Sequence, residues 1–176
     1  MIDLDLDLGD GLRLRNLGPD DVDLVVAGTA TETAPALWGP RPRGPYSADE
    51  AASALREWAG SQVSYGLIRD GALLGAVGLM HDGPGSAELA YWVRPESRRQ
   101  GLALRGIVAI TGWAHRDGGL PRVWVEINPD NTASRSLAER AGFSFEQRAK
   151  EHCRAWSTDD PATDTWHDCL IFGQAG

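Results

Sequence analysis

The chain is poor in cysteine, with only Cys153 and Cys169 among 176 residues. Two cysteines so far apart in the sequence are too few for a disulfide framework or a zinc site, and the four histidines are scattered. Reduced thiols are the usual state of such cysteines inside cells. We therefore expect two free thiols and no bound metal.

Long apolar runs are also absent. No stretch of about 18 uninterrupted apolar residues occurs, and Met1 to Asp10 is acidic where a signal peptide would be basic and then apolar. We expect a cytoplasmic protein without a membrane partner. An apolar content of 42% in 176 residues is enough for one substantial core and short for two, so we expect a single domain over residues 1–176.

Positive charge is scarce overall, and the net charge of −8 argues against a nucleic-acid partner. The distribution is uneven, because Arg94 to Arg105 contains four arginines and one acid, Glu96. An anionic cofactor at this basic stretch and a cationic partner at the acidic surface would fit the asymmetry. A solvated acidic surface that keeps the protein in solution is the alternative explanation for the acids.

Hydrophobic periodicity and turn residues predict a mixed α+β fold. Period-two alternation, or short apolar runs between turn residues, predict strands over 2–8, 12–17, 63–68, 72–80, 87–93, 123–127, 143–149 and 165–172. Helical spacing predicts helices over 20–27, 47–60, 102–117 and 132–141. The Asp70-Gly71 pair predicts a tight hairpin, and turns are expected over 81–85 and irregular loops over 29–46 and 156–162. We expect a central, mostly antiparallel sheet of six to seven strands with about four flanking helices.

A glycine loop follows the strand predicted over Ala87 to Val93 and precedes a helix. It consists of Arg98, Arg99, Gln100, Gly101, Leu102 and Ala103. The start of a helix has unpaired backbone N–H groups, which are a natural phosphate site. Gly101 and Ala103 have little side chain to obstruct a phosphate.

This Arg-x-x-Gly-x-Ala loop, in its strand-to-helix context, resembles the acyl-coenzyme A pyrophosphate loop of the GNAT superfamily of N-acetyltransferases. The resemblance extends over Ala87 to Glu146 in an ordered series of features. These are Glu88 and Tyr91-Trp92 on a strand, the glycine loop, a strand ending at Glu126, Asn128 with Asn131 and Ser134, and the pair Gly142-Phe143. With Leu12-Arg13-Leu14-Arg15 and Trp166-His167-Asp168, the chain is most similar to the RimJ/RimL branch, whose best-known members acetylate the N-terminal amines of ribosomal proteins.

The resemblance implies a GNAT-like sheet that is splayed at the acyl-coenzyme A site, with residues 87–146 as the coenzyme-binding half. It implies acetyl-coenzyme A as cosubstrate and no metal. Backbone groups of Trp92, Val93 and Arg94 would hold the pantetheine and the acetyl carbonyl, although the Trp92 side chain is more simply explained as a core aromatic. The glycine loop would hold the pyrophosphate, Arg94 or Arg105 would reach the ribose phosphate, and Asn131 would bind the pantetheine. Asn128 would join this site or only terminate its strand.

Glu88 is the first candidate for the general base. It lies in an otherwise apolar and aromatic strand, where partial burial would raise its pKa. A structural ion pair, or a carboxylate that binds the amine, is the alternative. Glu126, near the end of the following strand, is the second candidate.

Ser134 is the candidate donor of a proton to the leaving thiolate. Many GNAT members carry a tyrosine four residues before the Gly-Phe pair, whereas this chain has Ala138 there. The RimL-like pattern assigns the task to a serine at the position of Ser134. The alternative is that Ser134 only caps the helix start.

We therefore expect an acetyl-coenzyme A dependent N-acetyltransferase with a protein or peptide N-terminus as acceptor. Acetylation of a small amine, such as an antibiotic or a metabolite, remains an alternative, as does a non-catalytic acyl-coenzyme A binding module. A dinucleotide-binding enzyme fits less well, because the loop follows an antiparallel meander and lacks a third glycine at the required spacing. A homodimer is left open.

Overall fold

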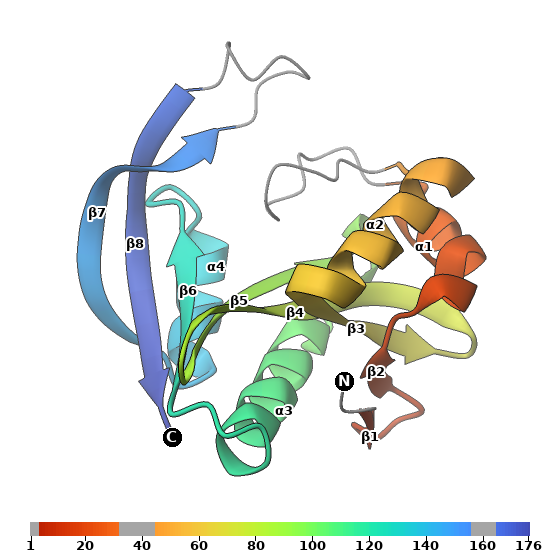
Figure 1. Cartoon of the computed structure of the whole chain (residues 1–176), viewed down its shortest axis with the longest axis horizontal. Helices are drawn as coiled ribbons and strands as arrows, with labels where there is room; N and C mark the ends of the chain where they lie inside the picture. Colours follow the sequence, from red (N-terminus) through yellow and green to blue (C-terminus); the bar gives the residue numbers. More distant parts are fainter. Residues whose placement is uncertain (1–3, 32–44, 156–164) are drawn as a thin grey trace.

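The computed structural model describes residues 4–31, 45–155 and 165–176. Within these ranges eight strands form one sheet, flanked by four α-helices (Figure 1). The strands are β1 Asp5–Asp7, β2 Arg13–Asn16, β3 Gln62–Arg69, β4 Ala72–Gly83, β5 Ser86–Val93, β6 Arg122–Ile127, β7 Ser144–Ala155 and β8 Thr165–Ala175. The helices are α1 Val22–Thr29, α2 Ala48–Ser61, α3 Leu102–Arg116 and α4 Thr132–Arg140.

The sheet has the order β1-β2-β3-β4-β5-β6-β8-β7, and over the described ranges its only parallel pair is β5 with β6. Its first five strands form an antiparallel meander. The β3–β4 hairpin turns at Asp70 and Gly71, which have φ angles of 50° and 73°. A tight hairpin turn requires such positive angles. The parallel pair exists because α3 returns the chain to the same end of the sheet, as a crossover connection must.

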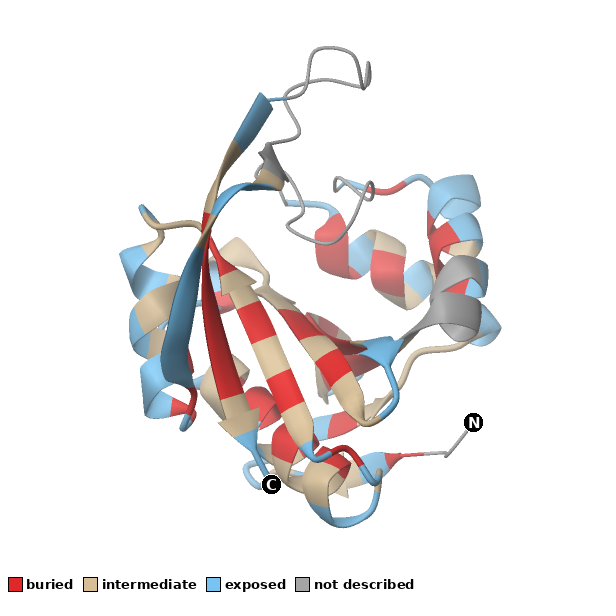
Figure 2. Ribbon diagram, turned by 60° about the vertical axis from the view of Figure 1, so that its left-hand side comes forward, coloured by how far each residue is buried: buried red, intermediate tan, exposed pale blue. Residues whose placement is uncertain are grey.

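The helices cover both faces of the sheet. Leu102 and Ile107 of α3 and Ala138 of α4 belong to one buried cluster, whereas Val25 of α1 and Leu55 of α2 belong to another. Buried and partly buried residues alternate along the central strands in Figure 2, because successive side chains of a strand point to opposite faces. The face that meets α3 and α4 is therefore distinct, residue by residue, from the face that meets α1 and α2.

Strand β5 shows this alternation most clearly. Leu89, Tyr91 and Val93 contribute to the cluster under α3 and α4. Ala90 and Trp92 belong to the cluster under α1 and α2, and Glu88 shares their parity. Consequently Glu88 and Tyr91, three residues apart, project to opposite sides of the sheet.

The expected mixed α+β class is confirmed, with differences in detail. Over the described residues the sheet has eight strands instead of six or seven, because every predicted strand segment joins it, including the short β1, which pairs with β2. The turn expected over 81–85 is shorter, since β4 continues to Gly83 through a register shift after His81. Strands β7 and β8 are also longer than expected. Most of the loops expected over 29–46 and 156–162 lies outside the described residues.

Local signals explain where two of the helices begin. At the start of α2, Ser47 and Glu50 form the expected capping box, with Ser47 N–H donating to Glu50 Oε2 at 2.8 Å and Glu50 N–H donating to Ser47 Oγ at 3.3 Å. At α4 the cap is Asn131, whose Oδ1 accepts from the Ser134 N–H at 3.0 Å. Among the residues that the structure describes, no helix is both long and apolar enough to cross a membrane.

Candidate active site

The strands β5 and β6 diverge at the centre of the sheet. Their recorded pairing covers only Ser86, Ala87 and Glu88 of β5, opposite 122–124 of β6. Beyond Glu88, β5 stays paired with β4 as far as Val93, and β6 stays paired with β8 as far as Ile127. Each strand therefore keeps its outer neighbour while its inner edge parts from the other (Figure 1). This is the splay that the resemblance to the GNAT superfamily implied.

The start of α3 faces open space. Gly101 occupies the N-cap position with φ 75° and ψ 4°, and the helix start has no side-chain cap. A Cβ atom placed on Gly101 would meet no atom within 4 Å. The first turn of a helix has backbone N–H groups without intrahelical partners, and they attract anions. The observed backbone therefore fits a pyrophosphate.

Glu88 is a partly buried carboxyl on the α1 and α2 side of β5. Burial, together with the nearby negative charges of Glu126 and Asp82, raises its pKa from 4.5 to about 7. The part of the chain that the structure describes gives Glu88 no cationic partner among its ion pairs. A carboxyl with a pKa near neutrality is suited to take a proton from an amine.

Glu126 lies on the same side of the splay but already has close neighbours. Its Oε1 lies 2.8 Å from Nε2 of His152, and its Oε2 lies 3.1 Å from Sγ of Cys153. Asp82 accepts a hydrogen bond from the indole N–H of Trp124 at 2.7 Å. Among the described residues, Glu126 and Asp82 have close partners for their oxygens and none is found for Glu88, which makes Glu88 the stronger candidate for the base.

The opposite side of β5 carries a residue that the sequence analysis did not assign. The hydroxyl of Tyr91 is hydrogen-bonded to Oγ of Ser134 across the gap between β5 and α4. Since Asn131 caps the helix, the Ser134 hydroxyl is not used for capping. Burial raises the pKa of Tyr91, although the hydrogen bond with Ser134 acts in the opposite direction, so the phenol is protonated at neutral pH. Period-two alternation in the sequence places Tyr91 opposite Glu88, but only the docking of α4 reveals its partner.

Comparison with known proteins identifies the family. The model of the "Acetyltransferase (GNAT) domain" matches residues 11–144, most of the chain. The chain belongs to the GNAT acetyltransferase family.

Solved acetyltransferase structures share the whole fold. A ribosomal-protein-S5-alanine acetyltransferase from Vibrio fischeri superposes with a TM-score of 0.77 at 14% identity, over 98% of this chain and 97% of that one. RimL, a ribosomal L7/L12 α-N-protein acetyltransferase in complex with coenzyme A, gives 0.76 at 18% identity over 98% of both chains. A GNAT acetyltransferase from Bacillus anthracis gives 0.76 at 16% identity over 98% of both chains. No curated protein matches the sequence at the level required for significance.

Two arginines of the basic stretch Arg94 to Arg105 already contact other groups of this GNAT domain. Arg105 donates to the carbonyls of Leu8 and Gly9 and lies 3.4 Å from a carboxylate oxygen of Asp10, so it anchors the β1–β2 turn. Arg94 pairs with Glu96. These contacts make Arg105 a poor candidate for the ribose phosphate.

Two further arginines lie on the glycine loop. The side chain of Arg98 donates to the carbonyl of Val93 at 2.9 Å, which ties the loop to the end of β5. Arg99 is exposed with a positive φ of 63°. Binding of phosphate by either remains a prediction.

The other GNAT-derived assignments remain predictions with different structural support. Leu102 is 2% exposed within the core, so only its backbone can contact a ligand, while Ala103 is partly buried and Gln100 is exposed. Trp92 packs against the second core cluster, as expected for a core aromatic. Asn128 accepts from the Asp130 N–H at 2.9 Å, which is the arrangement of a strand-ending turn.

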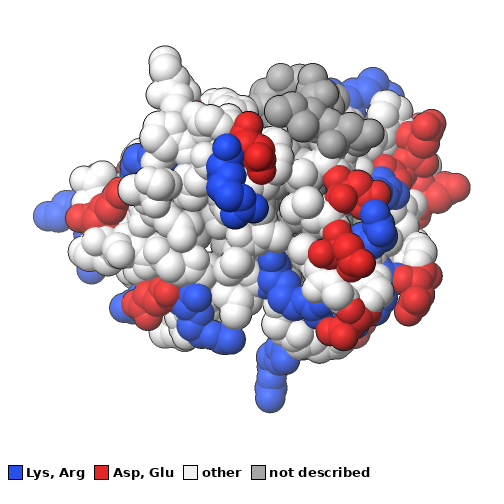
Figure 3. All heavy atoms as spheres, turned by 90° about the horizontal axis from the view of Figure 1, so that it is seen from below, with Lys and Arg blue, Asp and Glu red and all other residues white. Residues whose placement is uncertain are grey.

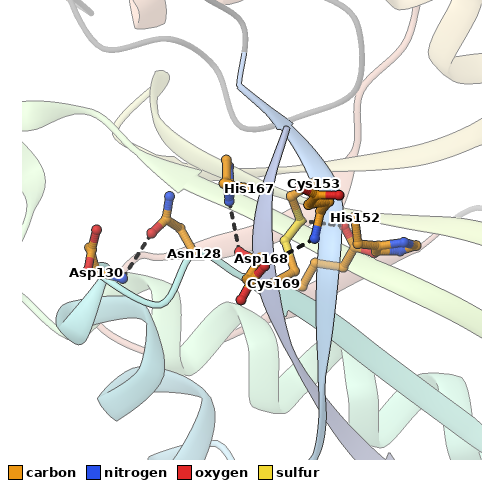
Figure 4. Close-up of a disulfide and its surroundings, with 9 residues drawn as sticks. Asn128, Asp130, His152, Cys153, His167, Asp168 and Cys169 are labelled. Carbon is orange, nitrogen blue, oxygen red and sulfur yellow. Dashed lines mark hydrogen bonds and ion pairs between the residues drawn. A yellow bond between two sulfur atoms is a disulfide. The ribbon is translucent and has the colours of Figure 1, made fainter. Parts of the chain in front are cut away.

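The expectation of two free thiols is wrong in this structure. Cys153 and Cys169 form a disulfide between β7 and β8, with their Cα atoms 5.7 Å apart (Figure 4). Separation along the sequence misled the prediction, because antiparallel pairing of the two strands brings the residues within disulfide range.

Proposed function

We propose that this GNAT domain transfers an acetyl group from acetyl-coenzyme A to a primary amine, with a protein or peptide N-terminus as the acceptor. The observation that carries the proposal is the arrangement around β5. Glu88 projects to one side of the splayed strand, and the Tyr91–Ser134 pair projects to the other. An amine and a thioester can therefore approach the splay from opposite sides.

On the acceptor side, Glu88 removes the amine proton. An amine attacks a thioester only as the neutral form, so an ammonium nitrogen loses two protons in all, one before the attack and one as the N–C bond forms. Glu88 passes the first proton to solvent and then accepts the second. With a pKa of about 7, Glu88 is deprotonated in a large fraction of molecules at neutral pH and still basic enough to accept it. Asp82 and Glu126 add negative charge that attracts the ammonium form before its deprotonation.

On the coenzyme side, the start of α3 binds the pyrophosphate and Ser134 lies toward the leaving group. The new N–C bond forms while the C–S bond breaks, and the sulfur leaves with the electron pair. Ser134 donates its hydroxyl proton to that sulfur, and Tyr91 returns a proton to the serine oxygen through the observed hydrogen bond. Solvent then restores the Tyr91 proton.

Protein N-termini are the favoured acceptors because of the resemblance to the RimJ/RimL branch. Two of the similar structures are named as acetyltransferases of ribosomal proteins. The acidic acceptor side also suits a cationic N-terminal segment. The proposal includes a single domain and a cytoplasmic location, and it leaves open whether the protein forms a homodimer.

A panel of acceptors tests this function directly. Release of free coenzyme A thiol is measured with saturating acetyl-coenzyme A and N-terminal peptides, with the same peptides blocked at the N-terminus, and with small amines. We expect turnover with free N-terminal peptides and none with blocked ones, and Glu88→Gln as the matched control should lower it. Preference for a small amine would mean that the acceptor is a small molecule and not a protein N-terminus. Tight acetyl-coenzyme A binding without turnover on any acceptor would identify a binding module.

A further inference from the structure

Three metal-ligating side chains meet on the last three strands of the sheet, and a fourth, His152, contacts one of them. Glu126 comes from β6, His152 and Cys153 from β7, and Cys169 from β8. Single oxygen or sulfur atoms of Glu126, Cys153 and Cys169 all lie within 4.8 Å of one another. Nε2 of His152 lies 2.8 Å from Oε1 of Glu126. The strand order β6-β8-β7 places Cys169 between the other two strands.

We propose that, when Cys153 and Cys169 are reduced, these four side chains bind a divalent zinc ion. Two thiolates, one imidazole and one carboxylate are a ligand set that zinc accepts in tetrahedral geometry, and the sulfur ligands disfavour magnesium and calcium. The observations behind this proposal do not depend on the acetyl-transfer assignment, although Glu126 takes part in both.

A contact in the disulfide form supports the proposal that the cluster also has a reduced form that binds a metal ion. Sγ of Cys153 lies 3.1 Å from Oε2 of Glu126. A disulfide sulfur has no proton, so two electron-rich atoms face each other there without a donor between them. A thiol would donate to the carboxylate, and a metal ion would bind both atoms. The Cys169 side chain is fully buried, so such an ion would be shielded from water on one side.

Reduction of the disulfide, which must precede zinc binding, needs a two-electron reductant. A dithiol or phosphine reductant supplies two electrons to the disulfide, and each sulfur takes up one proton. Zinc binding then releases both thiol protons, because the thiolate is the ligand. With one carboxylate and neutral imidazole, the ligands carry three negative charges against the two positive charges of the ion.

The sequence predicts no zinc site, because only two cysteines are present. The remaining two ligands are a carboxylate and an imidazole that no spacing motif connects. Only the pairing of β6, β7 and β8 brings them together, with a register shift between Ala149 and Cys153 that sets the position of His152 and Cys153.

Cobalt(II) is the probe that tests the site. The full-length protein is reduced with a phosphine, freed of excess reductant and titrated with Co²⁺ under argon. We expect one equivalent to produce thiolate-to-cobalt charge-transfer absorption in the near ultraviolet and the visible bands of tetrahedral cobalt, both displaced by one equivalent of Zn²⁺. Protein oxidised to the disulfide should give neither signal.

Variants decide which side chains are ligands. Cys153→Ser and Cys169→Ser should each weaken Co²⁺ binding at least tenfold and remove sulfur charge-transfer intensity. Glu126→Gln and His152→Ala should each weaken binding by a similar factor while keeping that intensity. His81→Ala, which changes an exposed histidine of β4, is the matched control and should bind as the parent. Circular dichroism checks that each variant is folded. Absence of sulfur charge transfer in the reduced parent, or its persistence in the double cysteine variant, would overturn the proposal.

Discussion

The pH range in which Glu88 favours the folded state is opposite to the range in which it can act as a base. Its carboxyl has a folded-state pKa of about 7 against an ordinary value of 4.5, chiefly because burial disfavours the charged form. The protonated form suits the fold, whereas the ionised form is needed to accept a proton from an amine. The same burial that makes the group useful therefore costs stability at the pH of activity.

The first prediction concerns activity. Turnover of a verified acceptor should fall as pH drops below about 7, because Glu88 becomes protonated, and Glu88→Gln should be about a hundredfold slower and lack this limb. Glu126→Gln removes a charge that raises the Glu88 pKa, so its profile should shift to lower pH. Initial rates at saturating substrates from pH 5.5 to 8.5 measure this. Coenzyme affinity should be nearly unchanged in Glu88→Gln, and a large loss of affinity with preserved turnover would make Glu88 structural.

The second prediction concerns stability. Between pH 4.5 and about 7 the folded state retains a proton that the unfolded state has lost, so the parent loses stability as pH rises through this window. Glu88→Gln cannot lose that proton. Relative to the parent, its free energy of unfolding should increase from pH 5 to pH 8, by an amount on the order of 3 kcal/mol at most. Urea denaturation at both pH values measures it, and a pH-independent difference would contradict the raised pKa.

A third prediction tests the hydrogen bond between Tyr91 and Ser134. Tyr91→Phe and Ser134→Ala should each reduce single-turnover acetyl transfer about tenfold to a hundredfold, because each breaks the proton path to the thiolate. The double variant should be little slower than either single variant, since residues that act as a unit are not additive. Parental rates in folded Ser134→Ala would mean that solvent protonates the thiolate. Independent, additive losses would mean that the two hydroxyls have separate roles.

At the scale of elements, the start of α3 provides the fourth prediction. Gly101→Ile should weaken acetyl-coenzyme A binding at least tenfold, or about 1.4 kcal/mol, because a branched side chain would fill the space proposed for the pyrophosphate. Calorimetry measures the affinity.

Gly119 offers a matched control near the other end of α3. Its φ is 64° against 75° for Gly101, and a Cβ atom on either would meet nothing within 4 Å. Both isoleucine variants therefore carry similar backbone strain. Gly119→Ile should lose stability but keep its affinity for the coenzyme. Equal losses of affinity would attribute the effect at Gly101 to strain.

Elements with strong local signals were predictable from the sequence, and long-range pairings were not. The β3–β4 hairpin follows from Asp70-Gly71 alone, and Glu88 stands out as an acid within an apolar strand. The contact of Tyr91 with Ser134 depends on how α4 docks across β5, 43 positions along the chain. The disulfide depends on a shifted register in β7, where Glu151 has a φ of 47° that no local pattern indicates.

At the scale of the whole molecule, acidic side chains are concentrated toward one side. Acidic side chains gather toward the side that carries α1, β1 and β2, among scattered arginines (Figure 3). The carboxyls of Asp82, Glu88 and Glu126 add a separate negative centre near the splay. In a chain of net charge −8, a cationic acceptor is attracted over a distance that salt shortens.

The fifth prediction follows from this field. For two peptides with the same N-terminal residue, one followed by arginines and one by neutral residues, KM should rise several-fold with salt only for the basic peptide. kcat should stay constant for both, with acetyl-coenzyme A saturating. Initial rates at about 0.05 M and 0.5 M salt measure the effect. Equal salt dependence for the two peptides would show that the acidic surface does not select acceptors.

The alternation along β5 also separates two kinds of evolutionary change. Under the proposed function, substitutions at even-numbered positions such as Glu88 would alter the acceptor side of β5, while those at odd-numbered positions such as Tyr91 would alter the coenzyme side. Acceptor preference can therefore diverge between descendants while the handling of the thioester is inherited unchanged. A single inserted residue before Glu88 would exchange the two surfaces, so β5 should tolerate substitutions far better than changes in length.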